Sequence, residues 1–318
     1  MAEYTDNLGM FRIGTDPNKS IPTTLRDNFE AVDSKLGNSL TDSAGKKWNT
    51  LGERMNSEQT KVDTIDSTIE SLKNRSVNVV LNHHYFRTIS KQGATTFPPN
   101  TLLSYRYAAE WGYFGVMGDA QMSKDGKWIM FSDLTVDEKT DDTGAVKDKT
   151  FAELKALDVG SKVSGIFADV RMASFDDFLT LMKATQSTPF INLIGDYTDL
   201  QIKSMVDMIQ SWGLVNDSAV LSNNITNLQK VRLYDKKIAC GLYVSTHTDD
   251  ILDSIFSINN SFAIYYDSQI TEENMSVART KGVPVFAWLA TDTNDKLKEI
   301  VRMGVRGAFT RNPAIRGV

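Results

Sequence analysis

Apolar and polar positions alternate in two different ways from about residue 77 to the end of the chain. Short apolar runs rich in β-branched residues predict strands, whereas stretches with an apolar residue every three or four positions predict helices. The predicted strands are 77–81, 114–117, 128–131, 190–194, 219–221, 238–244, 262–266, 283–289 and 307–310. The predicted helices are 101–111, 175–184, 200–212, 272–281 and 295–303.

This succession of strands and helices predicts the fold class. Strands that alternate with helices favour a parallel sheet, and the stretch is close to the ~250 residues of a (β/α)8 barrel. The nine strand candidates exceed a closed barrel by one, and the KDG turn at 124–126 predicts that 128–131 pairs antiparallel with the strand before it. An open doubly wound sheet is the alternative, but no GxGxxG follows the first predicted strand. We therefore expect an α/β fold, a (β/α)8 TIM-type barrel.

The first 76 residues have a different pattern. Residues 1–23 place glycines and prolines among polar residues, which predicts an extended arm. Between residues 25 and 36, apolar side chains spaced four, three and four apart predict a helix. From Trp48 to Leu72 the spacing alternates between three and four, which is a heptad seam interrupted only by Glu58.

A helix with so narrow an apolar stripe is marginal alone and needs a partner. It either packs on the barrel of its own chain or forms a parallel coiled coil with copies of itself, and we favour the second. Val62, Ile65 and Ile69 place β-branched residues at both seam positions, which favours a homotrimer. We expect residues 1–76 to form a helical, coiled-coil-like region for anchoring and oligomerisation, followed by the barrel at 77–318.

Composition narrows the classes of partner. The net charge is -5, the pI is about 5.4, and no run of Lys or Arg stands out, so we expect no nucleic-acid partner. The only cysteine, Cys240, lies in an apolar run, which predicts a core position and excludes an intrachain disulfide. The N-terminus lacks the pattern of a signal peptide, and no apolar stretch approaches the ~18 residues of a membrane span. We therefore expect no membrane insertion.

A series of short motifs follows the first predicted strand: PPNT (98–101), GVMGDAQMSKDG (115–126), IMFSD (129–133), TGAVKDKTFAEL (143–154), VFAWLATD (285–292) and GVRGAFTRNP (304–313). With these motifs, the segment 97–161 resembles the core of the glycerophosphodiester phosphodiesterase family. Members carry HRG, then PENT, an ELD strand, a KDG turn, a VFHD strand and TGxVxxxTxxEL. The resemblance covers residues 78–318 and implies a (β/α)8 barrel with its site at the carboxyl ends of the strands.

The resemblance also implies a chemistry, in which two histidines act as acid and base and carboxylates hold a divalent ion. His83 falls at the place of the first histidine, with His84 at that of the following arginine. The second histidine corresponds to Ser132, followed by a retained Asp133. His83 and His84 are therefore the residual candidates for catalysis.

The carboxylates that the family uses for the metal are mostly replaced. The glutamate of PENT corresponds to Pro99 and that of the ELD strand to Met117, while Asp119 is retained. Leu193 and Gly195 stand where the family has a glutamate and a lysine. One carboxylate holds a hard divalent ion poorly. We therefore expect a degenerate site with no cofactor, and Asp119 is the only residual metal candidate.

Five residues are candidates for binding a ligand at the barrel mouth. We expect Arg87 in the loop after the first strand, where it could contact a phosphate, and Trp288 as a pocket wall. The other candidates are carboxylates at predicted strand ends: Asp119, Asp133 and Asp196.

The N-terminal pattern and the missing catalytic residues favour a non-enzymatic function. The segment IPTTLRDNFEAVDSKL (21–36) resembles the anchoring segments of bacteriophage tail and baseplate proteins. The first hypothesis is therefore a structural or receptor-binding component of a virion, made in the host without a signal peptide. Its expected partners are copies of itself, other tail or baseplate proteins, and the glycerol-phosphate polymers (teichoic acids) of the cell wall.

Two other hypotheses stay open. One is a metal-dependent glycerophosphodiester or teichoic acid phosphodiesterase with a rebuilt site. It would use His83 or His84 as acid or base, and Asp119, Asp133 and Asp196 as ligands of Mg or Ca. The other is a scaffold in which the barrel serves only as a spacer or as a trimer-forming block. Chelator-sensitive hydrolysis separates the first of these from both non-enzymatic hypotheses.

Overall fold

The computed structural model describes residues 40–41, 47–48, 57, 60, 81, 86–94, 96–290 and 293–312. The chain divides into two compact units, residues 1–71 and 72–318. In the first unit, β1 (Leu40–Thr41) pairs antiparallel with β2 (Lys47–Trp48), so the heptad helix predicted to begin at Trp48 is wrong at that residue. Ser57 and Thr60 are helical, and the rest of the predicted seam lies outside the described residues.

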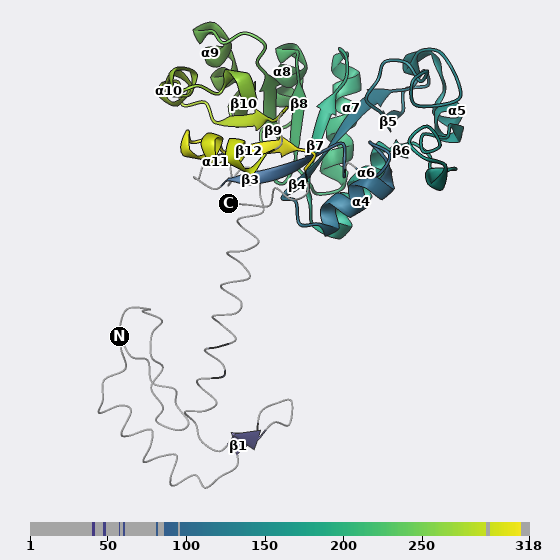
Figure 1. The fold of residues 1–318 in the computed structure, drawn as a ribbon, viewed down its shortest axis with the longest axis horizontal. Coiled ribbons are helices and arrows are strands. Elements are labelled where there is room, and N and C mark those ends of the chain that lie inside the picture. Colours follow the sequence, from purple (N-terminus) through teal and green to yellow (C-terminus); the bar gives the residue numbers. More distant parts are fainter. Residues whose placement is uncertain are drawn as a thin grey trace, which may run out of the picture. The chain divides into compact units, whose positions relative to one another are not determined.

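Eight parallel strands close into a barrel in the second unit (Figure 1). The ring runs in the order β3, β4, β7, β8, β9, β10, β11 and β12, and β12 pairs with β3 to complete it. The strands are β3 (Arg87–Lys91), β4 (Gly115–Met122), β7 (Thr188–Leu193), β8 (Ala219–Ser222), β9 (Ala239–Tyr243), β10 (Ser261–Tyr266), β11 (Val285–Trp288) and β12 (Gly307–Thr310). The (β/α)8 barrel is therefore confirmed.

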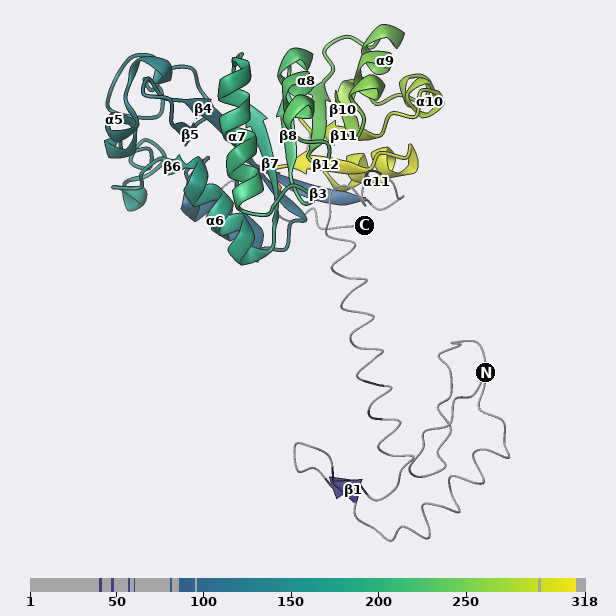
Figure 2. The ribbon, with the colours of Figure 1, turned by 180° about the vertical axis from the view of Figure 1, so that it is seen from behind.

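Helices cover the outside of this ring (Figure 2). They are α4 (Leu102–Glu110), α6 (Phe175–Thr185), α7 (Asp199–Ser211), α8 (Ile225–Tyr234), α9 (Asp249–Ile258), α10 (Glu272–Thr280) and α11 (Asn294–Arg302). Each begins after a Ser, Thr or Asn whose side chain accepts a hydrogen bond from a backbone N–H of the first turn. Such a cap stabilises a helix by about 1 kcal/mol. None of the helices described here is long and apolar enough to cross a membrane.

An extension grows from the far end of β4. The strand β5 (Trp128–Met130) pairs antiparallel with β4, as predicted, and β6 (Ala173–Ser174) pairs with β5. The extension continues with η1 (Val146–Asp148), α5 (Phe151–Ala156) and η2 (Gly165–Phe167), which Figure 1 shows on the β5 side of the barrel. Its separate apolar cluster comprises Ile129, Phe131, Val136, Val146, Leu154, Val159 and Met172.

The first barrel strand is not the predicted run at 77–81. Leu81 is helical and is buried in the cluster of residues that fills the barrel, while residues 77–80 lie outside the described part of the chain. The ring instead opens with β3, whose Ile89 pairs with Gly115 of β4. The sequence RTISK contains one large apolar residue, so its hydrophobicity does not reveal a strand. Residues 87–91 form a strand because they pair with β4 on one side and with β12 on the other.

The barrel interior is filled mainly by aromatic side chains. Phe190, Phe262, Phe286 and Phe309 are fully buried there and contact one another at ring-centroid distances of 4.5–6.4 Å. Glycines on the strands make room for these rings, since a Cβ atom on Gly241 would lie 2.6 Å from Phe262. The filled interior leaves the carboxyl ends of the strands as the place for a site.

Candidate active site

A single buried carboxylate lies at the mouth of the barrel. Asp119 of β4 is 2% exposed. Three side-chain amides donate to it: Gln92 Nε2 at 2.6 Å, Asn100 Nδ2 at 2.9 Å and Asn192 Nδ2 at 2.6 Å. Gln92 directly follows β3, and Asn192 lies opposite Asp119 on β7. The ends of three neighbouring strands therefore meet at one carboxylate.

Two of the three amides around Asp119 are held in one orientation. Asn100 Oδ1 accepts hydrogen bonds from the Tyr105 hydroxyl at 2.8 Å and from the backbone N–H of Asp119 at 3.0 Å, so its NH2 group must face the carboxylate. Gln92 Oε1 likewise accepts from Arg311. Burial, and then the charge of Asp119, raise the pKa of Tyr105 well above its usual value, which keeps this hydroxyl a donor.

Lys91 is the last residue of β3 and directly precedes Gln92, which contacts Asp119. Its side chain is buried, its ammonium donates to the backbone carbonyl of Leu289, and its Nζ lies 4.7 Å from the centroid of the Trp288 ring. Trp288 in turn packs against Tyr243 and Phe309 at centroid distances of 5.5 and 5.7 Å. Trp288 thus lies at the mouth, where its ring orients a lysine ammonium.

The segment after β5 follows the same face of β4. Gln121 lies two residues beyond Asp119, so both side chains point to the same side of the strand. Gln121 Nε2 donates to the backbone carbonyls of Phe131 at 2.8 Å and Asp133 at 2.7 Å. These bonds fix residues 131–133 next to the barrel mouth.

A second lysine reaches this segment. The Lys139 ammonium donates to Ser132 Oγ and, at 2.8 Å, to Asp133 Oδ1. Ser132 Oγ also donates to Asp133 Oδ1 at 2.9 Å. Lys139 and Asp133 are about one third exposed, at 32% and 37% of their side-chain surfaces. The position that corresponds to the family's second histidine is therefore occupied by a serine hydroxyl in contact with an ammonium group.

Three residues singled out from the sequence are not among the contacts of Asp119. Arg87 begins β3 instead of following it, and its guanidinium packs 5.8 Å from the centroid of the Phe114 ring, so its predicted place in the loop after the first strand is wrong. Asp196 is exposed and accepts a hydrogen bond from Asn224 at 2.7 Å. Leu193 packs into the outer core beneath the helices, and the side chain that reaches the site from β7 is its neighbour Asn192.

His83 and His84 lie outside the described residues. The structure nevertheless shows which residues stand at the end of the first strand, the place expected for them. Lys91 is the last residue of β3, and Gln92 and Gly93 follow it. The family's HRG therefore corresponds to Lys91, Gln92 and Gly93, with four residues between Gly93 and PPNT.

The donor set at the mouth does not fit a divalent ion of the Mg or Ca type. Such ions take several oxygen ligands, yet the groups that face Asp119 are three amide NH2 donors. The predicted partner carboxylates are engaged as well, Asp133 with Lys139 and Asp196 with Asn224. Within the described part of the chain, no group of three His, Cys, Asp or Glu side chains could hold a metal ion.

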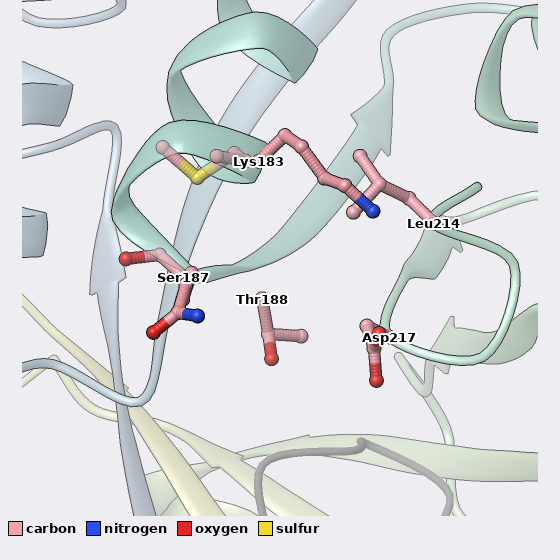
Figure 3. Close-up of a pocket in the computed structure, with 7 residues that line it drawn as sticks. Lys183, Ser187, Thr188, Leu214 and Asp217 are labelled. Carbon is pink, nitrogen blue, oxygen red and sulfur yellow. The ribbon is translucent and has the colours of Figure 1, made fainter. Parts of the chain in front are cut away.

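The barrel has one hollow near its mouth and another at its opposite end. One of about 450 Å³ shares Tyr243 with the barrel mouth, and its lining residues are Asp196, Asn223, Asn224, Ile225, Leu242, Tyr243, Ser245, Ile251 and Ser254. Another, of about 200 Å³, includes Thr188 at the start of β7 and so lies at the opposite end of the barrel (Figure 3). Lys183 and Asp217 line it, and burial raises the pKa of Asp217.

Comparison with known proteins identifies the family. Residues 92–315 match the sequence profile of the glycerophosphoryl diester phosphodiesterase family. The chain belongs to this family. The match begins at Gln92, in agreement with the first strand at 87–91 and with HRG corresponding to 91–93.

Similar proteins and structures support this assignment. A Bacillus subtilis protein named glycerophosphodiester phosphodiesterase is 41% identical over 257 residues, covering 71% of this chain and 83% of that protein. A Caldanaerobacter subterraneus protein of the same name is 26% identical over 225 residues, covering 68% and 89%. An Oleispira antarctica phosphodiesterase, solved with the product sn-glycerol-3-phosphate, has a TM-score of 0.68 at 20% identity, covering 73% of this chain and 96% of that one.

These findings correct the functional expectation. The hypothesis of a non-enzymatic virion component, with a pseudoenzyme barrel on a phage tail or baseplate, is wrong. The two relatives described above are named glycerophosphodiester phosphodiesterases, and the Oleispira antarctica structure holds a reaction product. Placement in a virion depended on that hypothesis and loses its support with it. The physical reason is that Lys91 and Lys139 reach the mouth only in the folded chain, through contacts that the sequence pattern does not indicate.

Proposed function

We propose that this chain hydrolyses phosphodiesters of glycerol, with a site rebuilt around Asp119, Lys91 and Lys139. The observation that carries the proposal is the position of these groups. A buried, hydrogen-bonded carboxylate and a buried ammonium lie where a barrel of this family has its chemistry, and a second ammonium contacts Ser132. The names of the relatives and the product bound in a related structure supply the substrate class.

The positive groups stabilise the charge of the phosphate. Lys91 and Arg311 offset the negative charge that develops on the phosphoryl oxygens. Lys139, held by Ser132 and Asp133, is placed to give a proton to the leaving alkoxide.

Asp119 orients the attacking water molecule. An ionised carboxylate accepts about four hydrogen bonds, and three of them come from Gln92, Asn100 and Asn192. The remaining acceptor site binds the water and takes its proton as the water oxygen attacks phosphorus, while the P–O bond to the alcohol breaks and Lys139 protonates the leaving oxygen. The amide cage thus acts as a positioning device for the one carboxylate.

The hollow beside Tyr243 binds the alcohol portion of the substrate. Its lining combines a carboxylate with amide and hydroxyl side chains, which are groups that bind hydroxyls of a polyol. We therefore propose substrates with a polyhydroxylated alcohol, including the repeating units of glycerol-phosphate polymers such as teichoic acid. Glycerophosphoglycerol is expected to react with a higher kcat/KM than a glycerophosphodiester of a simple alcohol.

The test of this function is product release from defined glycerophosphodiesters and from polyglycerol phosphate. Liberated glycerol 3-phosphate is measured for the full chain, with Lys91→Met and with Lys203→Met as a matched control. Lys203 pairs with Asp207 on α7, on the exposed outside of the barrel. We expect turnover that Lys91→Met abolishes and Lys203→Met leaves unchanged. A folded chain with no turnover on any of these substrates would refute the proposal.

We also propose that the heptad seam of residues 51–72 assembles the chain into a homotrimer. The support is the heptad spacing and its β-branched seam positions. Replacing Ile65 and Ile69 together by Asp in the full chain places charges in the seam and should reduce the mass measured by light scattering from three chains to one. A wild-type mass of a single chain would contradict this.

A further inference from the structure

The amide cage and the two lysines point to one departure from the chemistry that the family implies. Members of the family are expected to neutralise the phosphate with a divalent ion held by carboxylates. Here the retained carboxylate of Asp119 accepts from three amide NH2 groups, and Tyr105 orients that of Asn100 while Arg311 orients that of Gln92. A cation would have to displace hydrogen-bond donors from Asp119 in order to reach it.

Protein cations stand at both positions that correspond to the family's histidines. Lys91 takes the first position, at the end of β3. Lys139 reaches the second position by its contact with Ser132. Arg311 directly follows β12, whose Thr310 pairs with Ser90, so it is level with Lys91 on the neighbouring strand. The positive charge at the mouth thus comes from side chains on β3, on the segment after β5 and beyond β12.

We propose that the barrel mouth binds the phosphate group directly through Lys91, Lys139 and Arg311, without a divalent cation. This inference rests on the proposed function for its ligand, but it concerns binding and can hold even if hydrolysis fails. Two carboxylates lie among these cations: Asp133 contacts Lys139, and Asp119 is joined to Arg311 through Gln92.

The ammonium groups are oriented before the ligand arrives. A backbone carbonyl and the Trp288 ring hold Lys91, while Ser132 and Asp133 hold Lys139. A lysine held in this way loses less side-chain entropy on binding than a free one. Charge-assisted hydrogen bonds from ammonium to phosphate are among the stronger polar contacts. Pre-oriented lysines can therefore supply the affinity that a metal ion supplies elsewhere.

The experiment is calorimetric titration of the full chain with sn-glycerol 3-phosphate, with EDTA in one arm and with Mg or Ca in the others. We expect a dissociation constant that differs by less than about twofold among the arms. Lys91→Met and Lys139→Met should each weaken binding about tenfold or more, while Lys91→Arg keeps part of the affinity because it keeps the charge. Lys203→Met serves as the control that removes a lysine far from the mouth.

Each outcome decides the inference. Binding lost in EDTA and restored by Mg or Ca would overturn it, as would wild-type affinity in both methionine variants or no binding in any arm. If Lys91→Met unfolds the chain, as judged by circular dichroism, then Lys91→Arg and Lys139→Met carry the test. Metal-independent binding without hydrolysis would leave this inference standing and refute the proposed function. Hydrolysis that requires metal, with metal-dependent binding, would do the reverse.

Discussion

The extension after β5 and the barrel mouth differ in how closely they follow the family pattern. In the extension, TGAVKDKTFAEL matches and its residues stabilise the fold. Thr150 and Glu153 form a capping box at α5, Lys149 pairs with Asp142 at 2.5 Å, and Val146 is fully buried. At the mouth, the side chains that donate to Asp119 are Gln92, Asn100 and Asn192, and of these only Asn100 lies in a matched motif. A match in residues that serve folding therefore identifies the fold, and the mouth has to be analysed from its own contacts.

The largest effect that would separate the two regions is expected at Asp119. Asp119→Asn leaves three amide donors facing a neutral amide and removes the charge at the mouth. We expect kcat/KM for glycerophosphodiesters to fall at least about a hundredfold, in line with the loss of a preorganised polar group. Steady-state kinetics on the purified variant measures this.

The matched control is Asp217→Asn, which changes the carboxylate in the hollow at the other end of the barrel. This variant should keep the wild-type kcat/KM. Equal losses in the two variants would show that the mouth is not where the chemistry occurs.

A smaller and more specific effect is expected at Lys139. If its ammonium protonates the leaving alkoxide, Lys139→Met should lower kcat about a hundredfold for a glycerol leaving group. A nitrophenolate leaving group needs no proton, so turnover of a p-nitrophenyl phosphodiester should fall much less. An equal loss on both substrates would assign Lys139 to binding or folding instead of proton transfer.

A structural variant in the extension should show the opposite behaviour. Thr150→Ala removes the side chain that accepts from the Glu153 N–H at the start of α5. We expect a loss of about 1 kcal/mol in the free energy of unfolding of the extension, with kcat/KM unchanged. Hydrogen exchange of the α5 amides measures the loss in unfolding free energy. A large decrease in kcat/KM for this variant would contradict the view that the extension serves only the fold.

The fold was predictable from the sequence to the extent that apolar runs mark strands. Seven of the eight barrel strands coincide with predicted runs, because a strand buried on both faces is nearly continuous in hydrophobicity. The exception is β3, whose RTISK pattern has only Ile89 as a large apolar side chain. The helices α5, α8 and α9 also lie outside the predicted ranges, and in α8 Leu228 and Val231 are the only large apolar residues that are fully buried.

The site was predictable only in part. Asp119 was found because it lies in a matched motif, and Asn100 could have been found in the same way, since it is the asparagine of PPNT. Asn192 could have been found from the alternation of β7, which places it on the face of Asp119. Lys139 offers no such signal. It lies seven residues beyond Ser132 in a segment without regular structure, and only the folded chain brings the two together.

The smallest predicted effect concerns the ion pair that joins the extension to the barrel. Lys155 of α5 lies 3.1 Å from Asp177 of α6, where Asp177 also caps the helix with Ser174. Burial would raise the pKa of Asp177, but hydrogen bonds with Ser174 and Lys155 outweigh it and lower that pKa. A lowered pKa in the folded state stabilises the fold above the ordinary carboxyl pKa, and this contribution disappears as the pH falls through the lowered value.

Urea unfolding between pH 7 and pH 3 should therefore show a loss for the wild type that Asp177→Asn lacks. The expected difference at pH 7 is only about 0.5 kcal/mol because the pair is partly exposed. Asp207→Asn, which breaks a pair within the single helix α7, controls for the general loss of a surface charge. A difference between wild type and Asp177→Asn that persists unchanged at pH 3 would show that the side chain contributes by packing and not by its charge. The contact would then join the extension to the barrel without any dependence on pH.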